Sequence, residues 1–210
     1  KDFLKKYQIP SARYRAFSEI EAAKRYLDFM EFPCVIKADG LAAGKGVIIA
    51  QSRAEAEQAI ELIMRDKAFG PAGDQLVIEE CLRGEEASFL AFTDGKTVLA
   101  LPSSQDHKAA YDGDTGPNTG GMGAYSPAPV LTPEMKQKVM DEIMLPAVQG
   151  MASEGRPYSG ILYAGLMISE EQVHVLEFNC RFGDPECQPL LMRLQSDLVE
   201  LCNHCIDGTL

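Results

Sequence analysis

Glu177 and Asn179 are the two side chains best placed to bind a cation, because they lie two residues apart in the apolar run VHVLEFN at residues 173–179. If this run is a strand, its side chains alternate between two faces: Val173, Val175, Glu177 and Asn179 on one, and His174, Leu176 and Phe178 on the other. Two oxygen ligands about 7 Å apart along a strand suit Mg²⁺, which takes one or two protein oxygens and completes its shell with water and phosphate oxygens. The spacing predicts a metal site, and a carboxylate paired with Arg181 is the alternative.

Lys37 lies inside a second apolar run, CVIKA at residues 34–38. An unpaired lysine there would cost several kcal/mol of lost hydration or would lose its proton, so we expect an anionic partner. Strand alternation places Val35, Lys37 and Asp39 on one face. Both a local pair with Asp39 and a bound phosphate satisfy this expectation.

The loop at residues 40–46 is rich in glycine and contains Lys45, which is typical of loops that bind phosphates. It differs from a Walker A loop, which has four residues between its glycines, Ser or Thr after the lysine, and a following helix. Here three residues separate Gly40 from Gly44, Gly46 follows Lys45, and the next run reads as a strand. The loop predicts either a hairpin tip whose amides and Lys45 fold over phosphates or an ordinary glycine-rich hairpin.

The segment VIEECLRGEE at residues 77–86 runs from an apolar strand into a polar elbow. Backbone groups left unpaired at such an elbow can bind the edge of an adenine, and Glu85 can accept hydrogen bonds from ribose hydroxyls. A solvated acidic turn is the alternative.

The elements that position these residues begin with two helices and two strands. Ser18 with Glu21 and Ser52 with Glu55 each form a capping-box pattern, which predicts helices over 18–30 and 52–65. The apolar runs 34–38 and 47–50 between them predict strands joined by the glycine-rich loop.

The rest of the chain alternates between strands, one long loop and helices. Residues 75–80, 86–93 and 97–101 predict three strands in an antiparallel meander. Residues 103–129 show no apolar period, and a loop that long is usually functional or disordered; we favour functional. Thr132 and Pro133 begin a long helix with a possible kink at Pro146. Strands over 160–168 and 172–178 and C-terminal helices follow, so the order of elements favours an α+β fold.

Composition narrows the possible partners and compartments. The chain has 210 residues, a formal net charge of -11 and no apolar run of membrane-span length, which argues against nucleic acid and against a membrane partner. We expect a cytoplasmic protein with reduced cysteines. A zinc site at Cys202, His204 and Cys205 is disfavoured because zinc takes four ligands. The first residue is not Met, so we expect a piece of a longer polypeptide.

Four segments resemble the phosphoribosylamine-glycine ligase family of the ATP-grasp superfamily. They are VIKADGLAAGKGV at 35–47, VIEECLRGEEASF at 77–89, SQDHKAAYDGDTGPNTGGMGAYSPAP at 104–129 and LEFNCRFGDPE at 176–186. The resemblance spans nearly the whole chain in order. It is most specific in GPNTGGMGAYSP followed by EFNCRFGDPE.

The resemblance implies ATP-dependent joining of glycine to 5-phosphoribosylamine through glycyl phosphate, with Mg²⁺ or Mn²⁺, in purine biosynthesis. It implies an α+β ATP-grasp fold in which two lobes bind ATP between them. Residues 11–80 would form the small lobe, and residues 81–210 with 1–10 the larger lobe. The N- and C-terminal domains of the family enzyme lie outside this sequence, so we expect the rest of the parent enzyme to be a partner.

The resemblance also implies a role for each matching residue. ATP would contact Lys37, Gly44, Lys45, Gly46, Glu79, Leu82 and Glu85, and the metal Glu177 and Asn179. The substrates would contact Asp106, His107, Lys108, Asn118, Thr119, Gly120, Gly121, Arg181 and Asp184, with Lys45, Arg181 and Asp184 acting in catalysis.

One departure from the family pattern leaves the metal site open. Many ATP-grasp enzymes carry a second metal carboxylate on the preceding strand, whereas residues 162–166 (LYAGL) have none. Either one carboxylate suffices, or Glu79 or a loop acid completes the site. The alternative functions are another ATP-grasp ligase and a nucleotide-binding module without catalysis.

Overall fold

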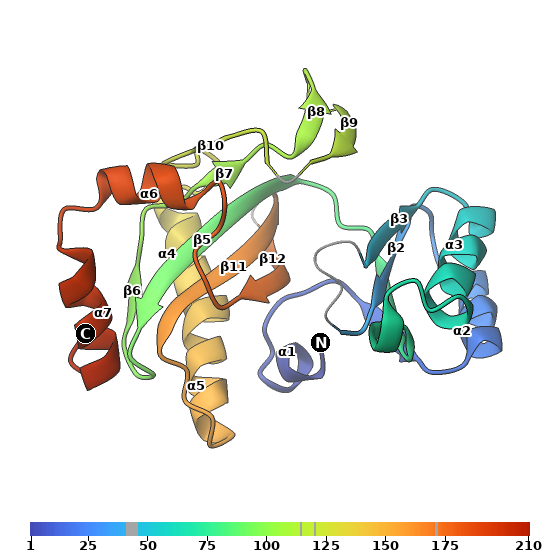
Figure 1. Ribbon diagram of the computed structural model, residues 1–210, viewed down its shortest axis with the longest axis horizontal. Coiled ribbons are helices and arrows are strands. Elements are labelled where there is room, and N and C mark those ends of the chain that lie inside the picture. Colours follow the sequence, from blue (N-terminus) through green and yellow to red (C-terminus); the bar gives the residue numbers. More distant parts are fainter. Residues whose placement is uncertain (41–45, 114, 120, 171) are drawn as a thin grey trace. The chain divides into compact units, whose positions relative to one another are not determined.

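The computed structural model describes residues 1–40, 46–113, 115–119, 121–170 and 172–210. Gly44, Lys45 and Gly120 lie outside these ranges. The chain divides into two compact units, which we call the small unit (residues 12–82) and the large unit (residues 1–11 and 83–210). Both units combine helices with antiparallel sheet, which confirms the α+β class (Figure 1). Every helix in the described ranges is too short or too polar to span a membrane.

The small unit is a four-stranded antiparallel sheet covered on one face by helices. Its strands lie in the order β1-β4-β2-β3. The strands are β1 (Tyr14–Phe17), β2 (Cys34–Ala38), β3 (Val47–Ala50) and β4 (Leu76–Glu80). The helices are α2 (Ile20–Tyr26) and α3 (Arg53–Ile60), with short turns of helix at Leu27–Phe29, Glu61–Arg65 and Gly70–Gly73. The predicted strands 34–38 and 47–50 are confirmed.

The two predicted capping boxes have different outcomes. Ser52 is the N-cap of α3, and its side chain accepts a bond from the Glu55 N–H, as predicted. The N-cap of α2 is Glu19 rather than Ser18, and it makes no side-chain cap bond. The Ser18 prediction is therefore wrong, because helix α2 begins one residue later than the pattern suggests.

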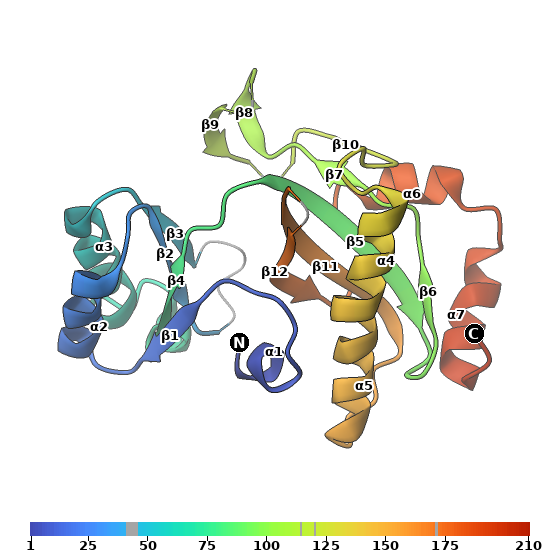
Figure 2. The same cartoon turned by 180° about the vertical axis from the view of Figure 1, so that it is seen from behind.

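The large unit is built on a second antiparallel sheet with helices on both faces. Its order is β12-β11-β5-β6. The strands are β5 (Glu85–Thr93), β6 (Val98–Ala100), β11 (Gly160–Ser169) and β12 (Gln172–Asn179). Helices α1 (Asp2–Lys6), α4 (Pro133–Val139) and α5 (Leu145–Ser153) pack on one face, and α6 (Cys187–Arg193) and α7 (Leu198–Asp207) pack on the other (Figures 1 and 2).

The predicted long helix is confirmed, with a local change of winding. Thr132 caps α4 through its side chain, as predicted. A π-helical turn at Met140–Met144 joins α4 to α5, and Pro146 lies in the first turn of α5. The predicted kink residue, Pro146, thus lies just after the π-helical turn, in the first turn of a helix, where its missing N–H leaves no helix bond unmade.

The predicted three-strand meander is wrong. Strand β4 pairs with β1 and β2 in the small unit, whereas β5 pairs with β6 and β11 in the large unit. The elbow at residues 81–84 carries the chain from one unit to the other, so strands that are neighbours in sequence belong to different sheets. Only the β5–β6 hairpin of the meander exists.

The sequence suggested that segment 103–129 is a long loop without secondary structure, but the structure shows short strands in it. It contains a ribbon of β7 (Gln105–Asp106) with β10 (Ala124–Tyr125) and a ribbon of β8 (Ala109–Tyr111) with β9 (Thr115–Asn118). The β8–β9 ribbon stands out from the main sheet of the large unit in both views (Figures 1 and 2). Each of these strands is only two to four residues long, which is too short for an apolar alternation to be recognised in the sequence.

A β-bulge in β12 overturns the predicted faces of that strand. Gly165 lies opposite Glu177, but Leu166 lies opposite Val175, so Leu176 has no opposite residue. Directly opposed residues share a face. Val173, Val175 and Phe178 therefore face the core under α4 and α5, whereas Glu177 and Asn179 share the other face with His174. Strict alternation had placed Val173 and Val175 with Glu177, and His174 opposite it.

Candidate functional site

Lys37 has the anionic partner that its burial demands, and the partner is Glu79. The Lys37 Nζ lies 3.1 Å from the Glu79 Oε2, and the two side chains are 21% and 3% exposed. Val35 is opposite Glu79 and Lys37 is opposite Val77, so Lys37 and Glu79 are diagonal neighbours on one face of the sheet. The sequence considered Asp39 or a phosphate as the partner and did not foresee Glu79 in this role.

The small unit brings further predicted ATP-binding residues near the same strands. The Gly46 carbonyl accepts a bond from the Ala38 N–H at 2.8 Å, which closes the base of the glycine-rich loop. Gly40 has no room for a side chain, since a Cβ there would lie 2.8 Å from the Ala72 Cβ. Gly44 and Lys45 fall outside the described residues, so the predicted phosphate lid stays a prediction.

The elbow that follows β4 contains Leu82 and leads to Glu85. A Cβ on Gly84 would lie 2.1 Å from the Ile168 carbonyl oxygen, and its φ of +152° also favours glycine. This close approach fixes the start of β5, where Glu85 is exposed. The Leu82 carbonyl accepts a weak bond from the Cys81 Sγ at 3.8 Å. The structure thus shows the predicted elbow, and its role in binding adenine and ribose stays a prediction.

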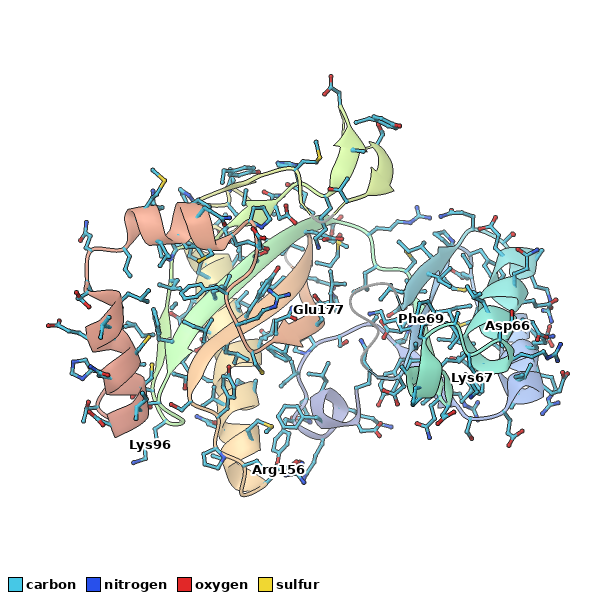
Figure 3. The ribbon with its side chains drawn as sticks, in the orientation of Figure 1. Asp66, Lys67, Phe69, Lys96, Arg156 and Glu177 are labelled. Atoms are coloured by element: carbon cyan, nitrogen blue, oxygen red, sulfur yellow. The ribbon has the colours of Figure 1, made fainter. Side chains whose placement is uncertain are left out.

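In the large unit, Glu177 and Asn179 lie together as predicted. The Asn179 Nδ2 donates to the Glu177 Oε1 at 3.0 Å. Glu177 lies over Gly165, where a Cβ would be 3.4 Å from the Glu177 Cγ. Figure 3 shows Glu177 at the end of the large sheet away from Lys96. The alternative pairing with Arg181 is not among the contacts of the described residues, and the Arg181 Nη1 donates instead to the Phe182 carbonyl at 2.8 Å.

The Glu177–Asn179 pair fits a hard divalent cation. Rotation of the Asn179 amide by 180° about its Cβ–Cγ bond would bring its oxygen beside the Glu177 carboxylate, so that two oxygens could face one cation. No group of three or more His, Cys, Asp or Glu side chains in the described ranges could hold a metal ion. The Glu177 carboxylate and the Asn179 amide offer two oxygens, which suits an ion such as Mg²⁺ that takes one or two protein oxygens and draws the rest of its shell from water and phosphates.

An acid-rich cluster surrounds Lys108 on the large unit. The Lys108 Nζ lies 2.9 Å from the Glu86 Oε2, and Glu86 was not singled out by the sequence. Burial lowers the pKa of Lys108, but the charges of Glu86, Asp106 and Glu177 raise it, and the net change is a rise. Lys108 is therefore a firmly charged cation among these carboxylates.

Asp106 lies in the same cluster, and its pKa is raised. Burial raises the pKa of Asp106, the charges of Glu186 and Glu86 raise it further, and Lys108 and His107 oppose this rise. The Asp106 Oδ1 is buried and has no hydrogen-bond partner among the described residues. Such a carboxyl group is more easily protonated than an exposed aspartate.

Backbone bonds within segment 103–129 gather the predicted substrate residues. The Thr119 N–H and Oγ1 both donate to the Lys108 carbonyl, at 2.7 and 2.9 Å. The Gly121 N–H donates to the Thr119 Oγ1, and the Met122 N–H donates to the His107 carbonyl. Asn118 pairs with Ala109 across the β8–β9 ribbon. The ribbons thus hold these residues close together.

The turn after β12 reaches the same region. A Cβ on Gly121 would lie 2.6 Å from the Pro185 Cδ and 3.1 Å from the Asp106 Oδ1, so this contact requires a glycine. The Asp184 Oδ1 accepts a bond from the Gln188 Nε2 at 3.0 Å. Asp184 therefore lies beside the segment that contains Asp106, as the resemblance implies, and its catalytic role stays a prediction.

A buried polar network near these residues was missed by sequence reasoning. The Glu186 Oε1 accepts bonds from the Ser88 Oγ at 2.8 Å and the Tyr163 Oη at 2.7 Å. Burial raises the pKa of Tyr163; the Ser88 bond lowers it and Glu186 raises it, so the phenol stays a donor well above neutral pH. Ser88 and Tyr163 interrupt apolar strands, and that interruption was the available signal.

Comparison with known proteins agrees with this fold. Residues 1–187 match the family described as the ATP-grasp (A) domain of phosphoribosylglycinamide synthetase, and the chain belongs to that family. A solved phosphoribosylamine–glycine ligase from Thermotoga maritima is 35% identical with a TM-score of 0.90, over 99% of this chain and 52% of that chain. The biotin carboxylase domain of a Hydrogenobacter thermophilus carboxylase shares the ATP-grasp fold alone, at 19% identity and a TM-score of 0.73, over 99% of this chain and 44% of that chain.

Sequence relatives give a closer similarity. The chain is 61% identical to the phosphoribosylamine–glycine ligase of Allochromatium vinosum and 60% identical to that of Yersinia pestis. Each match covers all of this chain and 49% of the relative. The chain thus spans about half the length of the curated relatives it matches.

Proposed function

We propose that this chain is the ATP-binding and metal-binding part of a phosphoribosylamine–glycine ligase. The proposed reaction joins glycine to 5-phosphoribosylamine and converts ATP to ADP and phosphate, giving glycinamide ribonucleotide for purine biosynthesis. Support comes from relatives of that name, which are about 60% identical over the whole chain. Because those relatives are about twice as long, we assign complete turnover to the full-length protein, with the rest of the parent enzyme as a partner of this chain.

The chemistry explains why phosphate-binding and metal-binding residues are needed. A carboxylate does not condense with an amine in water because its oxygen is a poor leaving group. A glycine oxygen therefore attacks the γ-phosphorus of ATP, the bond to ADP breaks, and glycyl phosphate forms. The amine nitrogen then attacks the carbonyl carbon, phosphate leaves and the nitrogen loses a proton. Phosphoryl transfer of this kind depends on positioning and charge neutralisation more than on a protein nucleophile.

The contact between Glu177 and Asn179 is the observation that carries the proposal. These two side chains would hold Mg²⁺ or Mn²⁺, and the bound ion would neutralise charge on the triphosphate. In the small unit, we propose that Lys37 is the cation that contacts phosphate and that Lys45, with the amides of Gly44 and Gly46, covers it. Glu79 and the main chain at Leu82 would bind adenine, and Glu85 would bind ribose.

The acid-rich cluster of the large unit is the proposed site for glycine and phosphoribosylamine. Lys108, which stays charged, suits a carboxylate or phosphate of a substrate. The same site would include Asp106, His107, Asn118, Thr119, Gly120, Gly121, Arg181 and Asp184. We propose that Lys45, Arg181 and Asp184 contact the reacting groups.

Two further parts of the proposal concern organisation and compartment. We propose that the small unit and the large unit correspond to the small and larger ATP-grasp lobes, which were predicted as residues 11–80 and as 81–210 with 1–10. We also propose a cytoplasmic enzyme. None of the six cysteines, all of which lie in the described ranges, forms a disulfide, and this suits a reducing compartment.

Substitution of Glu177 tests the proposal in the full-length protein. Glu177→Gln should lower kcat by at least about 10²-fold, because a metal ligand contributes several kcal/mol to charge stabilisation. Thermal unfolding should be unchanged, since Glu177 is exposed. The assay follows ADP formation that requires both glycine and freshly made phosphoribosylamine.

Asn179→Asp is the matched control for that experiment. It keeps an oxygen ligand at the second position, so Mn²⁺ binding should persist in Asn179→Asp and weaken in Glu177→Gln. Unchanged turnover in Glu177→Gln contradicts the metal assignment. A wild-type protein that binds ATP but forms no glycine-dependent ADP supports a nucleotide-binding module instead.

A further inference from the structure

Glu186 is a buried carboxylate that no step of the proposed reaction uses. Its residue exposure is 2%, and it lies between the turn at residues 181–185 and helix α6. Removing a carboxylate from water costs several kcal/mol unless hydrogen bonds compensate it. The bonds that Glu186 makes therefore indicate what it holds in place.

A single carboxylate oxygen joins Glu186 to two strands. The Ser88 Oγ on β5 and the Tyr163 Oη on β11 both lie within bonding distance of the Glu186 Oε1, at 2.8 and 2.7 Å. The two hydroxyl oxygens are 2.9 Å from each other. An ionised carboxylate accepts both bonds, so the three oxygens form a compact triangle inside the unit.

These two strand positions lie in the same rows of the sheet as the proposed metal ligands. Ser88 is opposite Gly165, which is opposite Glu177. Tyr163 is opposite Asn179 in the neighbouring row. Because opposed residues share a face, the network and the Glu177–Asn179 pair lie on the same face of the sheet.

The turn at residues 181–185 packs closely on the same carboxylate. The Cys187 N–H donates to the Gly183 carbonyl at 3.0 Å. A Cβ on Gly183 would lie 2.1 Å from the Glu186 Oε2 and 3.0 Å from the Tyr163 Cε1. The turn that contains Asp184 and follows Arg181 is therefore fitted against Glu186 and Tyr163 with no space to spare.

We propose that Glu186 is a positioning residue for the ligase reaction. Through Ser88 and Tyr163 it fixes β5 and β11 beside the strand that carries the Glu177–Asn179 pair, and through Gly183 it fixes the turn between Arg181 and Asp184. Glu186 itself touches neither substrate nor metal. This role rests on the proposed function. It makes Glu186 the residue that holds the Glu177–Asn179 pair and the turn at residues 181–185 in fixed positions relative to each other.

Three variants of the full-length protein test this role. Glu186→Leu removes the acceptor at similar volume, the double variant Ser88→Ala/Tyr163→Phe removes both donors, and Glu186→Gln keeps an acceptor oxygen. The first two should lower kcat about 10- to 100-fold, as the loss of groups that orient metal ligands does. They should weaken Mn²⁺ binding measured by electron paramagnetic resonance with ADP present. Glu186→Gln should stay within a few-fold of wild type in both measurements.

Thr93→Val is the matched control, because Thr93 is a buried residue at the other end of β5 whose Oγ1 accepts a bond from the Gly95 N–H at 3.1 Å. It loses a buried hydrogen bond of a β5 side-chain hydroxyl, although to a backbone N–H rather than to a carboxylate, and its kcat and Mn²⁺ binding should match wild type. If Glu186→Leu does not fold, the double variant decides the question, since it barely changes side-chain volume.

The inference is overturned if Glu186→Leu and Ser88→Ala/Tyr163→Phe both keep wild-type kcat and Mn²⁺ binding, or if Glu186→Gln loses as much as Glu186→Leu. A different result is expected if the proposed function itself is wrong. In that case the wild type itself forms no glycine-dependent ADP, while the Mn²⁺ and ADP measurement still reports whether Glu186 positions the ligand pair.

Discussion

Strands β2 and β12 both carry residues that we propose bind phosphate or metal, but only β2 keeps a regular alternation. In β2 the register with β3 and β4 runs without interruption, so Lys37 lies on the face predicted for it. In β12 the register shifts opposite Gly165 and Leu166. Residues before and after the shift therefore exchange faces.

The difference shows where strand alternation predicts the face of a side chain correctly and where it does not. Alternation holds for residues two apart on one side of a bulge, and so Glu177 and Asn179 were correctly placed together. It fails across the bulge, where one extra residue turns the following side chains to the other face. Val175 is fully buried in the core while Glu177, two residues later, is exposed on the site face.

The largest expected effect on stability comes from placing a charge at the core-facing residue next to the β-bulge. Val175→Asp should lower the free energy of unfolding by several kcal/mol, because it buries a carboxylate without a designed partner. The matched variant Leu176→Asp alters the extra residue of the bulge, which is half-buried, and should cost clearly less. Chemical denaturation of both variants provides the measurement. Equal destabilisation, or a larger loss in Leu176→Asp, contradicts the faces described here.

A smaller effect is expected in β2, where alternation holds. Lys37→Met keeps the apolar stem but removes the charged bond to Glu79, and should lower the free energy of unfolding by about 1.5–3 kcal/mol. Lys67→Met is the control, because its pair with Asp74 is 44% and 72% exposed and should contribute at most about 1 kcal/mol. The KM for ATP should rise only in Lys37→Met. If both variants lose the same stability, the burial of the Lys37–Glu79 pair has no energetic consequence.

The smallest expected effect on stability comes from the charged groups around Asp106. In the small unit Lys37 pairs with one carboxylate, Glu79, whereas in the large unit several carboxylates lie around Lys108. The folded pKa of Asp106 is raised, so the unfolded chain releases this proton at a lower pH than the folded protein. Stability is therefore lost as pH rises above the unfolded value of about 3.9. Asp106→Asn should be more stable than wild type at pH 7, by about 0.5 kcal/mol. The gain should shrink as pH approaches 4.

Asp94→Asn provides a control of opposite sign for the pH experiment. Backbone bonds from Thr97 and Lys96 lower the pKa of Asp94, so its charged form stabilises the fold above the unfolded pKa. Asp94→Asn should therefore be less stable than wild type at pH 7, with the difference lost as pH falls through the lowered pKa. Thermal unfolding from about pH 2 to pH 7 measures both variants, because the Asp94 contribution is lost only below the ordinary aspartate pKa of about 3.9. An Asp106→Asn variant that is less stable at pH 7 contradicts the raised pKa.

Several elements were predictable because their signals are local. The Ser52 and Thr132 caps depend on bonds to backbone groups three residues away, and the structure confirms both. Strand β2 was predicted with its observed bounds. Ser18 shows the limit of a local pattern, since the helix begins after Glu19 although the capping pattern is present.

The missed features all depend on partners distant in sequence. The Lys37–Glu79 pair needs β2 beside β4, and the Lys108–Glu86 pair needs segment 103–129 folded against β5. The Glu186 network spans separations of 98 and 23 residues. No spacing within a motif encodes such contacts, although polar residues inside apolar strands do mark that a partner is required.

The sequence by itself determined which residue types are present, where most helices and strands lie, and which motifs mark an ATP-grasp chain. Those features follow from side-chain chemistry and from interactions within a few residues. Only the tertiary structure decided which strands pair, which face Glu177 occupies and which carboxylate accompanies each lysine. Those outcomes depend on sheet register, and register is set by the packing of all the strands together, because a shift of one residue exchanges the buried and exposed faces.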